Sequence, residues 1–244
     1  EPTHRILHPL RIDSEAPIQT IHRQITNGLQ EEEFESVALS SDDQDSCGAD
    51  SITTVPINHE WSTYRKGVQL LHLYSSNPDL VHTGASGIKS HPLLIFMASV
   101  CGAKHIHTHH TVTPSNYGKQ RWLAEHADAV TAVSQFVANW ARDEFDISNV
   151  EVIPNGVNLE RFHPDVAQRE SERILYVGRF ADRKHPEIVI ELAKRNSEFN
   201  FIIRGNGPLQ ENLKQKAPSN VTFLDRLSEK ELSRQFAQAA IVLW

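Results

Sequence analysis

Short apolar runs alternate with longer segments of helical periodicity along the first part of the chain. The apolar run at 6–10 predicts a strand, and the segment after it has the apolar spacing of one helix face, at Ile18, Ile21, Ile25 and Leu29. Further strands are predicted at 36–39, 80–83, 105–108, 129–133 and 150–153, with helices at 64–74, 87–100, 122–126 and 135–145. This alternation favours a parallel sheet covered on both faces.

A second series of the same kind follows the turn triplet Pro154-Asn155-Gly156. The polar stretch 163–173 predicts a linker, after which strands are expected at 174–177, 199–203, 221–224 and 241–243 and helices at 186–195, 209–216 and 229–239. We therefore predict two Rossmann-like α/β domains, at 1–165 and 166–244. The second is expected to be incomplete, because its last apolar strand has no covering layer after it.

Composition and charge exclude several classes of protein. The chain has 244 residues, of which 39% are hydrophobic and 23% charged, as in an ordinary globular protein. Its formal net charge is -7 and its pI is about 6.0, which disfavours nucleic acid as a main partner. Cys47 and Cys101 lie in different contexts, polar and apolar, and indicate two unpaired thiols in a reducing compartment.

Neither a signal peptide nor a membrane-spanning helix is predicted. The first apolar run lacks the length and the small-residue cleavage pattern of a signal peptide. The longest apolar stretch, at 93–103, is shorter than the roughly 20 residues that a membrane helix needs. A buried helix accounts for it.

Two cations follow the first strand of the second series, where a parallel sheet gathers its ligands. Arg179 and Lys184 lie in the segment between Val177 and the helix expected from Pro186. Arginine offers a bidentate fork and lysine a point charge to a diphosphate, and the helix N-terminus adds a partial positive charge. Solvated charges at a strand end are the alternative interpretation.

A glycine pair follows the next strand, in Arg204-Gly205-Asn206-Gly207-Pro208. Glycine lets backbone approach a ligand closely, and the proline is suited to begin the next helix. A tight turn that needs positive φ explains an isolated Gly-x-Gly equally well.

Histidines mark the end of a strand in the first domain. Strand alternation places His105, His107 and His109 on one face and His110 on the other. No second cluster with ligand spacing accompanies them, and Asp43-Gln44-Asp45 is interpreted as a solvated acidic loop, so we predict no metal site. A single histidine at the carboxyl end is the functional candidate, whereas His105 and His107 are expected to be buried and satisfied.

One long stretch and several shorter ones resemble a known family. The segment from Val152 to Pro164, VIPNGVNLERFHP, is similar to the interdomain signature of the group 1, or family 4, glycosyltransferases of the GT-B fold. The second domain follows in that family's order, with YVGRF at 176–180, Lys184, GNGP at 205–208, Phe223, Glu231-Leu232 and AAIVL at 239–243. The resemblance covers nearly the whole chain and implies two lobes facing a cleft.

The resemblance also implies roles for residues. It gives His110 a catalytic position near the transferred sugar, with His109 as the alternative, and it gives Arg179 and Lys184 the donor diphosphate. Donor contacts are expected at Gly178, Gly205 and Gly207 as well, and acceptor-side contacts at Asp13, Ser14, Ser86, Gly87 and His109. Capping of the helix at Pro17 is an equal alternative for Ser14. No metal or other cofactor is required, because the two cations neutralise the leaving group.

The activity implied is transfer of a sugar, with retention, from a nucleotide-diphosphate sugar to a glycan or lipid-linked acceptor. Synthesis of cell-surface polysaccharide or glycolipid is the expected role, in the cytoplasm and with at most peripheral contact with the inner face of a membrane. The family carries a glutamate pair in a segment that would follow residue 244, so residues 1–244 alone are expected to be an inactive fragment. A sugar-nucleotide epimerase of the same fold and a non-catalytic sugar-nucleotide-binding protein are the alternatives.

Overall fold

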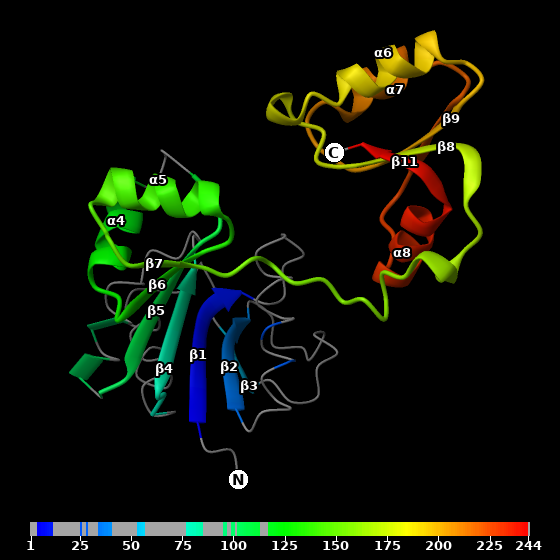
Figure 1. The fold of residues 1–244 in the computed structure, drawn as a ribbon. Coiled ribbons are helices and arrows are strands. Elements are labelled where there is room, and N and C mark those ends of the chain that lie inside the picture. Colours follow the sequence, from blue (N-terminus) through cyan, green and yellow to red (C-terminus); the bar gives the residue numbers. More distant parts are fainter. Residues whose placement is uncertain are drawn as a thin grey trace. The chain divides into compact units, whose positions relative to one another are not determined.

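The computed structural model describes residues 4–11, 25, 28, 34–40, 53–56, 77–84, 95–96, 99–100, 102–112 and 117–243 (Figure 1). The chain divides into two compact units, Glu1–Gly156 and Val157–Trp244. This division comes before the boundary expected after residue 165. The segment just after Gly156 belongs with the second unit because the ring of Phe162 packs against Phe236, with ring centroids 6.0 Å apart.

The first unit contains a seven-stranded sheet in which every pair of neighbouring strands is parallel. The order is β3-β2-β1-β4-β5-β6-β7, so the direction of winding reverses between β1 and β4. The strands are β1 His4–Arg11, β2 Phe34–Ser40, β3 Thr53–Pro56, β4 Leu80–Gly84, β5 Lys104–His109, β6 Ala129–Ala132 and β7 Val150–Val152. The parallel sheet predicted from the sequence is confirmed.

Strand β3 was not predicted. It is short, contains two threonines and ends at a proline, so it lacks the apolar run that identified the other strands. Among the described strands it lies at the edge of the sheet, where Pro56 is tolerated because no described strand pairs with the outer side of β3. The helices predicted after Pro17, at 64–74 and at 87–100 fall largely outside the described residues.

Two helices, α4 Tyr117–Glu125 and α5 Gln135–Phe145, cover one face of β5, β6 and β7 (Figure 1). Helix α5 begins where predicted, because the Ser134 hydroxyl accepts a hydrogen bond from the backbone N–H of Val137. It ends at Asp146, which adopts the left-handed conformation with φ of 56°. Its buried side is Val137, Ala138, Ala141 and Phe145.

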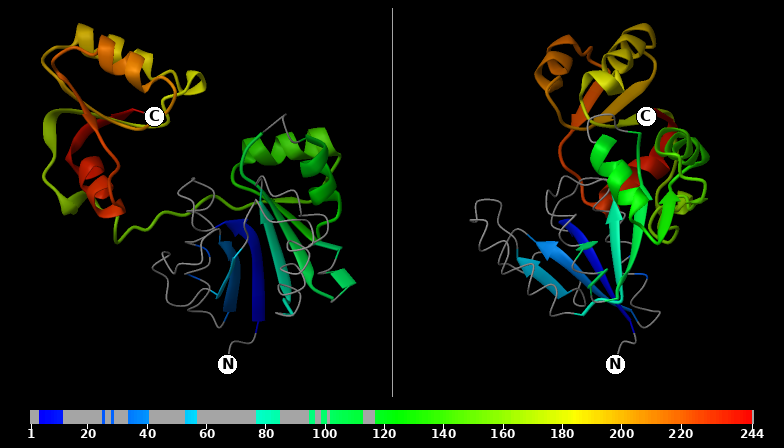
Figure 2. Two further views of the ribbon diagram at one scale, coloured as in Figure 1. Left: turned by 180° about the vertical axis from the view of Figure 1, so that it is seen from behind. Right: turned by 90° about the vertical axis from the view of Figure 1, so that its left-hand side faces the viewer.

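The second unit is a four-stranded parallel sheet in the order β10-β9-β8-β11. Its elements in chain order are η2 Pro164–Val166, β8 Glu170–Val177, η3 Asp182–Lys184, α6 Glu187–Arg195, β9 Asn200–Arg204, α7 Gln210–Lys216, β10 Val221–Leu224, α8 Glu229–Gln238 and β11 Ala239–Leu243. Helices α6 and α7 lie on one face of the sheet and α8 on the other (Figure 2). The winding reverses between β8 and β11, which makes the carboxyl ends of these strands the expected ligand-binding edge.

Strand β8 starts earlier than its apolar run. Glu170 pairs with Ala239 of β11 and Arg173 with Asn200 of β9, within a stretch that the sequence predicted as a linker. Backbone hydrogen bonds between strands do not depend on apolar side chains, so a polar segment at the end of a sheet can extend a strand. The first residues of β8 are accordingly exposed.

Among the helices that the structure describes, none combines the length and the apolar character needed to cross a membrane.

Candidate functional site

The loop between β8 and α6 carries the predicted donor-binding cations. Gly178 and Arg179 follow β8 directly, and Lys184 ends the short helix η3 before α6. The side chains of Arg179 and Lys184 are exposed, and within the described part of the chain neither forms an ion pair. Both charges are therefore available to an anion at this edge of the sheet.

The neighbouring loop, between β9 and α7, is joined to it by backbone hydrogen bonds. The N–H of Phe180 donates to the carbonyl of Asn206 at 2.8 Å, and the N–H of Leu209 donates to the carbonyl of Phe180 at 3.1 Å. The N–H of Gly178 likewise donates to the carbonyl of Arg204 at 3.1 Å. These bonds hold the backbone around Arg179 in one position.

This loop contact is what requires glycine at 205 and 207. A Cβ atom on Gly205 would overlap the carbonyl oxygen of Gly178, and one on Gly207 would overlap the carbonyl group of Phe180. Gly207 also has φ of +150°, which side chains rarely adopt. The close approach expected at these glycines is thus to the adjacent loop, and direct contact of either with a donor stays a prediction.

Gly178 has a different neighbour. A Cβ atom there would lie 2.7 Å from the hydroxyl oxygen of Tyr176, whose side chain is buried beneath the loop and stacks on Phe180 with ring centroids 6.4 Å apart. Burial raises the pKa of the Tyr176 hydroxyl, and the nearby Glu187 carboxylate raises it further. The ring keeps its proton and supports the loop from below.

Arg204 is a third cation at this edge, absent from the predicted donor-binding residues. It ends β9 and pairs with Val177, the last residue of β8. The signal was present in the sequence, as a basic residue directly after an apolar run. What the sequence could not show is that β9 lies next to β8.

In the first unit, the predicted residue His109 is fully buried. Its ring packs edge-on against Trp140 at 5.9 Å and lies 5.4 Å from the ring of Phe145, both from α5. Burial lowers the pKa of His109 to about 4, although the nearby Gln120 side chain opposes the shift. With an exposed fraction of 0%, the ring packs beneath α5 and presents no surface to an acceptor in this structure.

His110 follows β5 at its carboxyl end and is partly exposed. Burial lowers the pKa of this imidazole to about 4 as well. At neutral pH it is therefore an uncharged ring that can donate one hydrogen bond and accept another. The catalytic role expected for it stays a prediction.

The other two histidines of β5 form a hydrogen-bonded chain with Thr83. Nδ1 of His105 lies 3.1 Å from the carbonyl oxygen of His126, so Nδ1 carries the proton and Nε2, 2.7 Å from the Thr83 hydroxyl, accepts. Thr83 has then used its only hydrogen, so Nδ1 of His107 donates to the Thr83 oxygen at 2.8 Å. The expectation that His105 and His107 are buried and hydrogen-bonded is confirmed.

A second polar chain lies on the opposite face of the same strands. Nε2 of His82 is 2.7 Å from the Thr108 hydroxyl, which is 2.8 Å from the hydroxyl of Thr131. Within the described ranges, no three His, Cys, Asp or Glu side chains come together as metal ligands. Asp13, Ser14, Ser86 and Gly87, the other predicted acceptor-side residues, lie outside the described residues.

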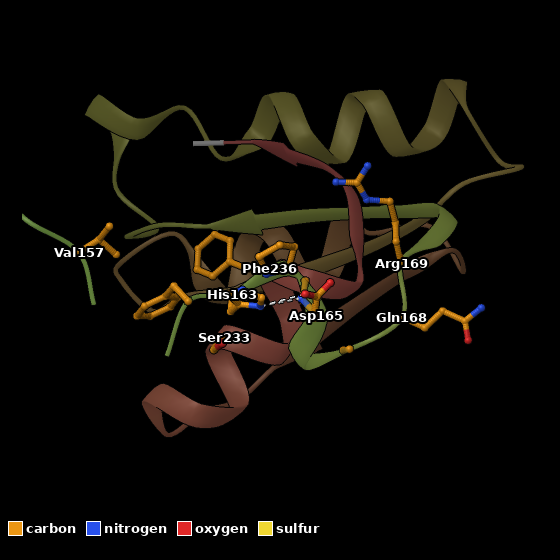
Figure 3. Close-up of a pocket in the computed structure, with 11 residues that line it drawn as sticks. Val157, His163, Asp165, Gln168, Arg169, Ser233 and Phe236 are labelled. Carbon is orange, nitrogen blue, oxygen red and sulfur yellow. Dashed lines mark hydrogen bonds and ion pairs between the residues drawn. The ribbon is translucent and has the colours of Figure 1, made fainter. Parts of the chain in front are cut away.

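A cavity of about 940 Å³ lies elsewhere in the second unit, between the segment after Gly156 and α8. Figure 3 shows Phe236, His163 and Ser233 grouped together, with Val157 and Arg169 toward its two ends. Its lining is mainly apolar and includes no predicted site residue. Its volume would suit a ligand, but the exposed cations and the sheet's winding reversal indicate the edge at Arg179.

Two family models together match almost the whole chain. The model described as Glycosyltransferase Family 4 matches residues 21–161, and the model described as Glycosyl transferases group 1 matches residues 160–244. Among curated proteins, no match was found.

Solved structures of glycosyltransferases share the fold at low sequence identity. A glycosyltransferase from Rickettsia africae ESF-5 is 15% identical with a TM-score of 0.75, over 99% of this chain and 73% of that one. Anabaena Alr3699/HepE in complex with UDP and glucose is 12% identical with a TM-score of 0.69, over 93% and 70%. AviGT4, involved in avilamycin A biosynthesis, is 18% identical with a TM-score of 0.64, over 98% and 69%. These likenesses support the predicted GT-B fold.

Proposed function

Because the chain belongs to Glycosyltransferase Family 4, we propose that it transfers a sugar, with retention, from a nucleotide-diphosphate sugar to a glycan or lipid-linked acceptor. The observation that carries the proposal is the pair of exposed cations, Arg179 and Lys184, without carboxylate partners in the described structure. They lie in one loop at the winding reversal of the second sheet.

The donor diphosphate is assigned to this loop on electrostatic grounds. As the bond between sugar and phosphate breaks, negative charge accumulates on the departing nucleoside diphosphate. A guanidinium and an ammonium group whose backbone is already positioned at this edge stabilise that charge. The hydrogen bonds between the two loops supply the rigidity, because they fix the backbone on both sides of Arg179.

Retention is proposed without a covalent intermediate on the protein. The described residues directly after β5 are His110, Thr111 and Val112, and those directly after β6 are Val133 and Ser134, so no carboxylate follows either strand. We propose that the acceptor attacks an oxocarbenium-like sugar from the face that the phosphate leaves. The neutral His110 imidazole, which can donate and accept hydrogen bonds, is proposed to contact the transferred sugar.

The solved relatives support the choice of donor. The Anabaena protein was crystallised with UDP-glucose, and an alpha-glucosyltransferase, 9% identical with a TM-score of 0.66, was crystallised with UDP-glucose and DNA. A nucleotide-diphosphate sugar is thus the donor class that we propose for this chain. Cell-surface polysaccharide or glycolipid is the product class that we propose, with synthesis in the cytoplasm.

The test is a donor screen on the full-length protein. Release of nucleoside diphosphate from UDP-, GDP- and ADP-sugars, measured with a pool of glycan and lipid-linked acceptors, should identify one preferred donor. NMR of the product should show the anomeric configuration of the donor. An inverted product would refute retention. Conversion of the donor to an epimer without transfer would show that the protein is an epimerase and not a transferase.

A further inference from the structure

An aromatic ring stands exposed where α5 begins, at the carboxyl end of the first sheet. Phe136 is the second residue of α5, and 71% of it is exposed. The backbone N–H of Val133, just before this helix, donates to the carbonyl of His109 at 3.2 Å. The start of α5 is therefore next to the end of β5, where His110 follows.

Phe136 lies on the solvent-facing side of α5, because the sheet-facing side of this helix is Val137, Ala138, Ala141 and Phe145. Trp140, one turn later, is half-buried, and its ring contacts His109 edge-on at 5.9 Å. Phe136 lies one turn nearer than Trp140 to the carboxyl end of the sheet. The exposed ring is thus in the first turn of the helix that starts at the same end of the sheet where His110 follows β5.

Two neutral amides, Gln135 and Asn139, lie before and after Phe136 on α5. The Gln135 side-chain NH₂ donates to the Asn139 oxygen at 2.8 Å, and Arg142 donates to the same oxygen at 3.1 Å. The two amides are exposed and their remaining donors and acceptors can pair with hydroxyl groups. A flat apolar ring next to exposed amides matches a sugar ring, which has an apolar C–H face and a rim of hydroxyls. An acyl chain would instead require a continuous apolar groove.

We propose that Phe136 is a specificity-determining residue on which an uncharged sugar ring of the acceptor stacks, at the sheet end where His110 follows β5. The inference rests on the proposed function, because it assigns the acceptor class for that same transfer. Stacking removes the exposed ring and the C–H face of the sugar from water together, and the Gln135 and Asn139 amides orient the hydroxyls.

The test compares Phe136→Ala and Phe136→Trp with the unchanged full-length protein. Binding to an array of neutral oligosaccharides should fall about tenfold in Phe136→Ala and be retained in Phe136→Trp. UDP affinity, measured by titration calorimetry, should be the same in all three proteins. Phe96→Ala removes a ring from another exposed position of the same unit and is the matched control, with unchanged glycan binding.

Each outcome separates the inference from the function on which it rests. Glycan binding that is equal in folded Phe136→Ala and the unchanged protein would overturn the inference, as would an unchanged protein that binds no neutral glycan. If Phe136→Ala loses binding to uncharged lipid vesicles but keeps its glycan binding, the ring binds a lipid instead. If no nucleoside diphosphate binds but glycan binding still depends on Phe136, the transferase proposal is refuted. The proposal that a sugar ring stacks on Phe136 is then retained.

Discussion

The Thr83 hydroxyl oxygen lies 2.7 Å from Nε2 of His105 and, in the same buried layer, serves as the acceptor for His107. One hydroxyl on β4 thereby bonds two imidazoles on β5; because the His126 carbonyl fixes the His105 proton on Nδ1, the Thr83 oxygen fixes the His107 proton on Nδ1 as well. Thr83 and His107 are 0% exposed, so water cannot replace these bonds. The stability of the first unit therefore depends on this one hydroxyl group.

Thr83→Val should destabilise the first unit strongly. Valine has nearly the same shape but leaves two buried imidazole nitrogens without their partner, at a cost of about 1–3 kcal/mol for each group. Urea unfolding followed by circular dichroism should show the lower midpoint. Thr222→Val, at an exposed position of β10, is the control and should change stability little. Equal midpoints for the two variants would contradict the hydrogen-bonded chain.

The first unit should lose stability in mild acid. Burial lowers the pKa values of His109 and His110 to about 4 and lowers that of His105 too, whereas an unfolded histidine has a pKa near 6.5. Between pH 6.5 and about 4 the unfolded chain therefore binds protons that the folded unit excludes. Stability should fall as pH falls through this window and level off below it.

Urea midpoints at pH 7.5, 6.0 and 5.0 would measure this dependence. His109→Leu removes one of the histidines, so its midpoint should change less between pH 7.5 and 5.0 than that of the unchanged protein. A pH dependence as steep as before would show that His109 does not contribute. His185→Leu is the comparison, because that histidine is exposed in the second unit.

Gly205→Ala should destabilise the second unit. The added methyl group would overlap the carbonyl oxygen of Gly178 and also lie 2.6 Å from the Phe180 ring, so the two loops must separate, at a cost of about 1–3 kcal/mol. Gly118→Ala has no atom within 4 Å of its methyl group and lies in a helix, where alanine is favoured. Thermal unfolding should show a loss for the first variant only.

Arg179→Ala and Lys184→Ala should each impair donor use and leave folding intact. Each removes one charged contact to the diphosphate, which corresponds to roughly a tenfold to hundredfold fall in kcat/KM for the nucleotide sugar. Both side chains are exposed and have no ion pair among the described residues, so the melting temperature should barely move. Arg195→Ala, at the exposed end of α6, is the charge-matched control. If either variant turns over the donor as fast as Arg195→Ala does, the substituted cation does not bind the donor.

Local sequence patterns were sufficient to predict most of the described strands and helices and the loop with Arg179 and Lys184. The apolar runs predicted most strands of both sheets, and the segment 135–145 predicted α5 at its observed position. The interdomain signature and the YVGRF stretch led to the family and to Arg179 and Lys184, because these features lie within a few consecutive residues.

Features that depend on a distant strand or loop required the tertiary structure. Strand β3 and the polar start of β8 exist because a neighbouring strand supplies their hydrogen bonds, and nothing in their own side chains indicates it. His109 and His110 are adjacent in sequence, yet the packing of Trp140 buries one and leaves the other partly exposed.

The sequence by itself determined the order of most strands and helices, the family, and the loop that carries the two cations, since periodicity and motifs are local. Only the tertiary structure decided which strands are neighbours, that Gly205 and Gly207 serve the contact between two loops, and that His109 is buried while His110 is partly exposed. The physical reason is that burial and close approach arise from chain segments that are far apart in sequence, and no local pattern specifies them.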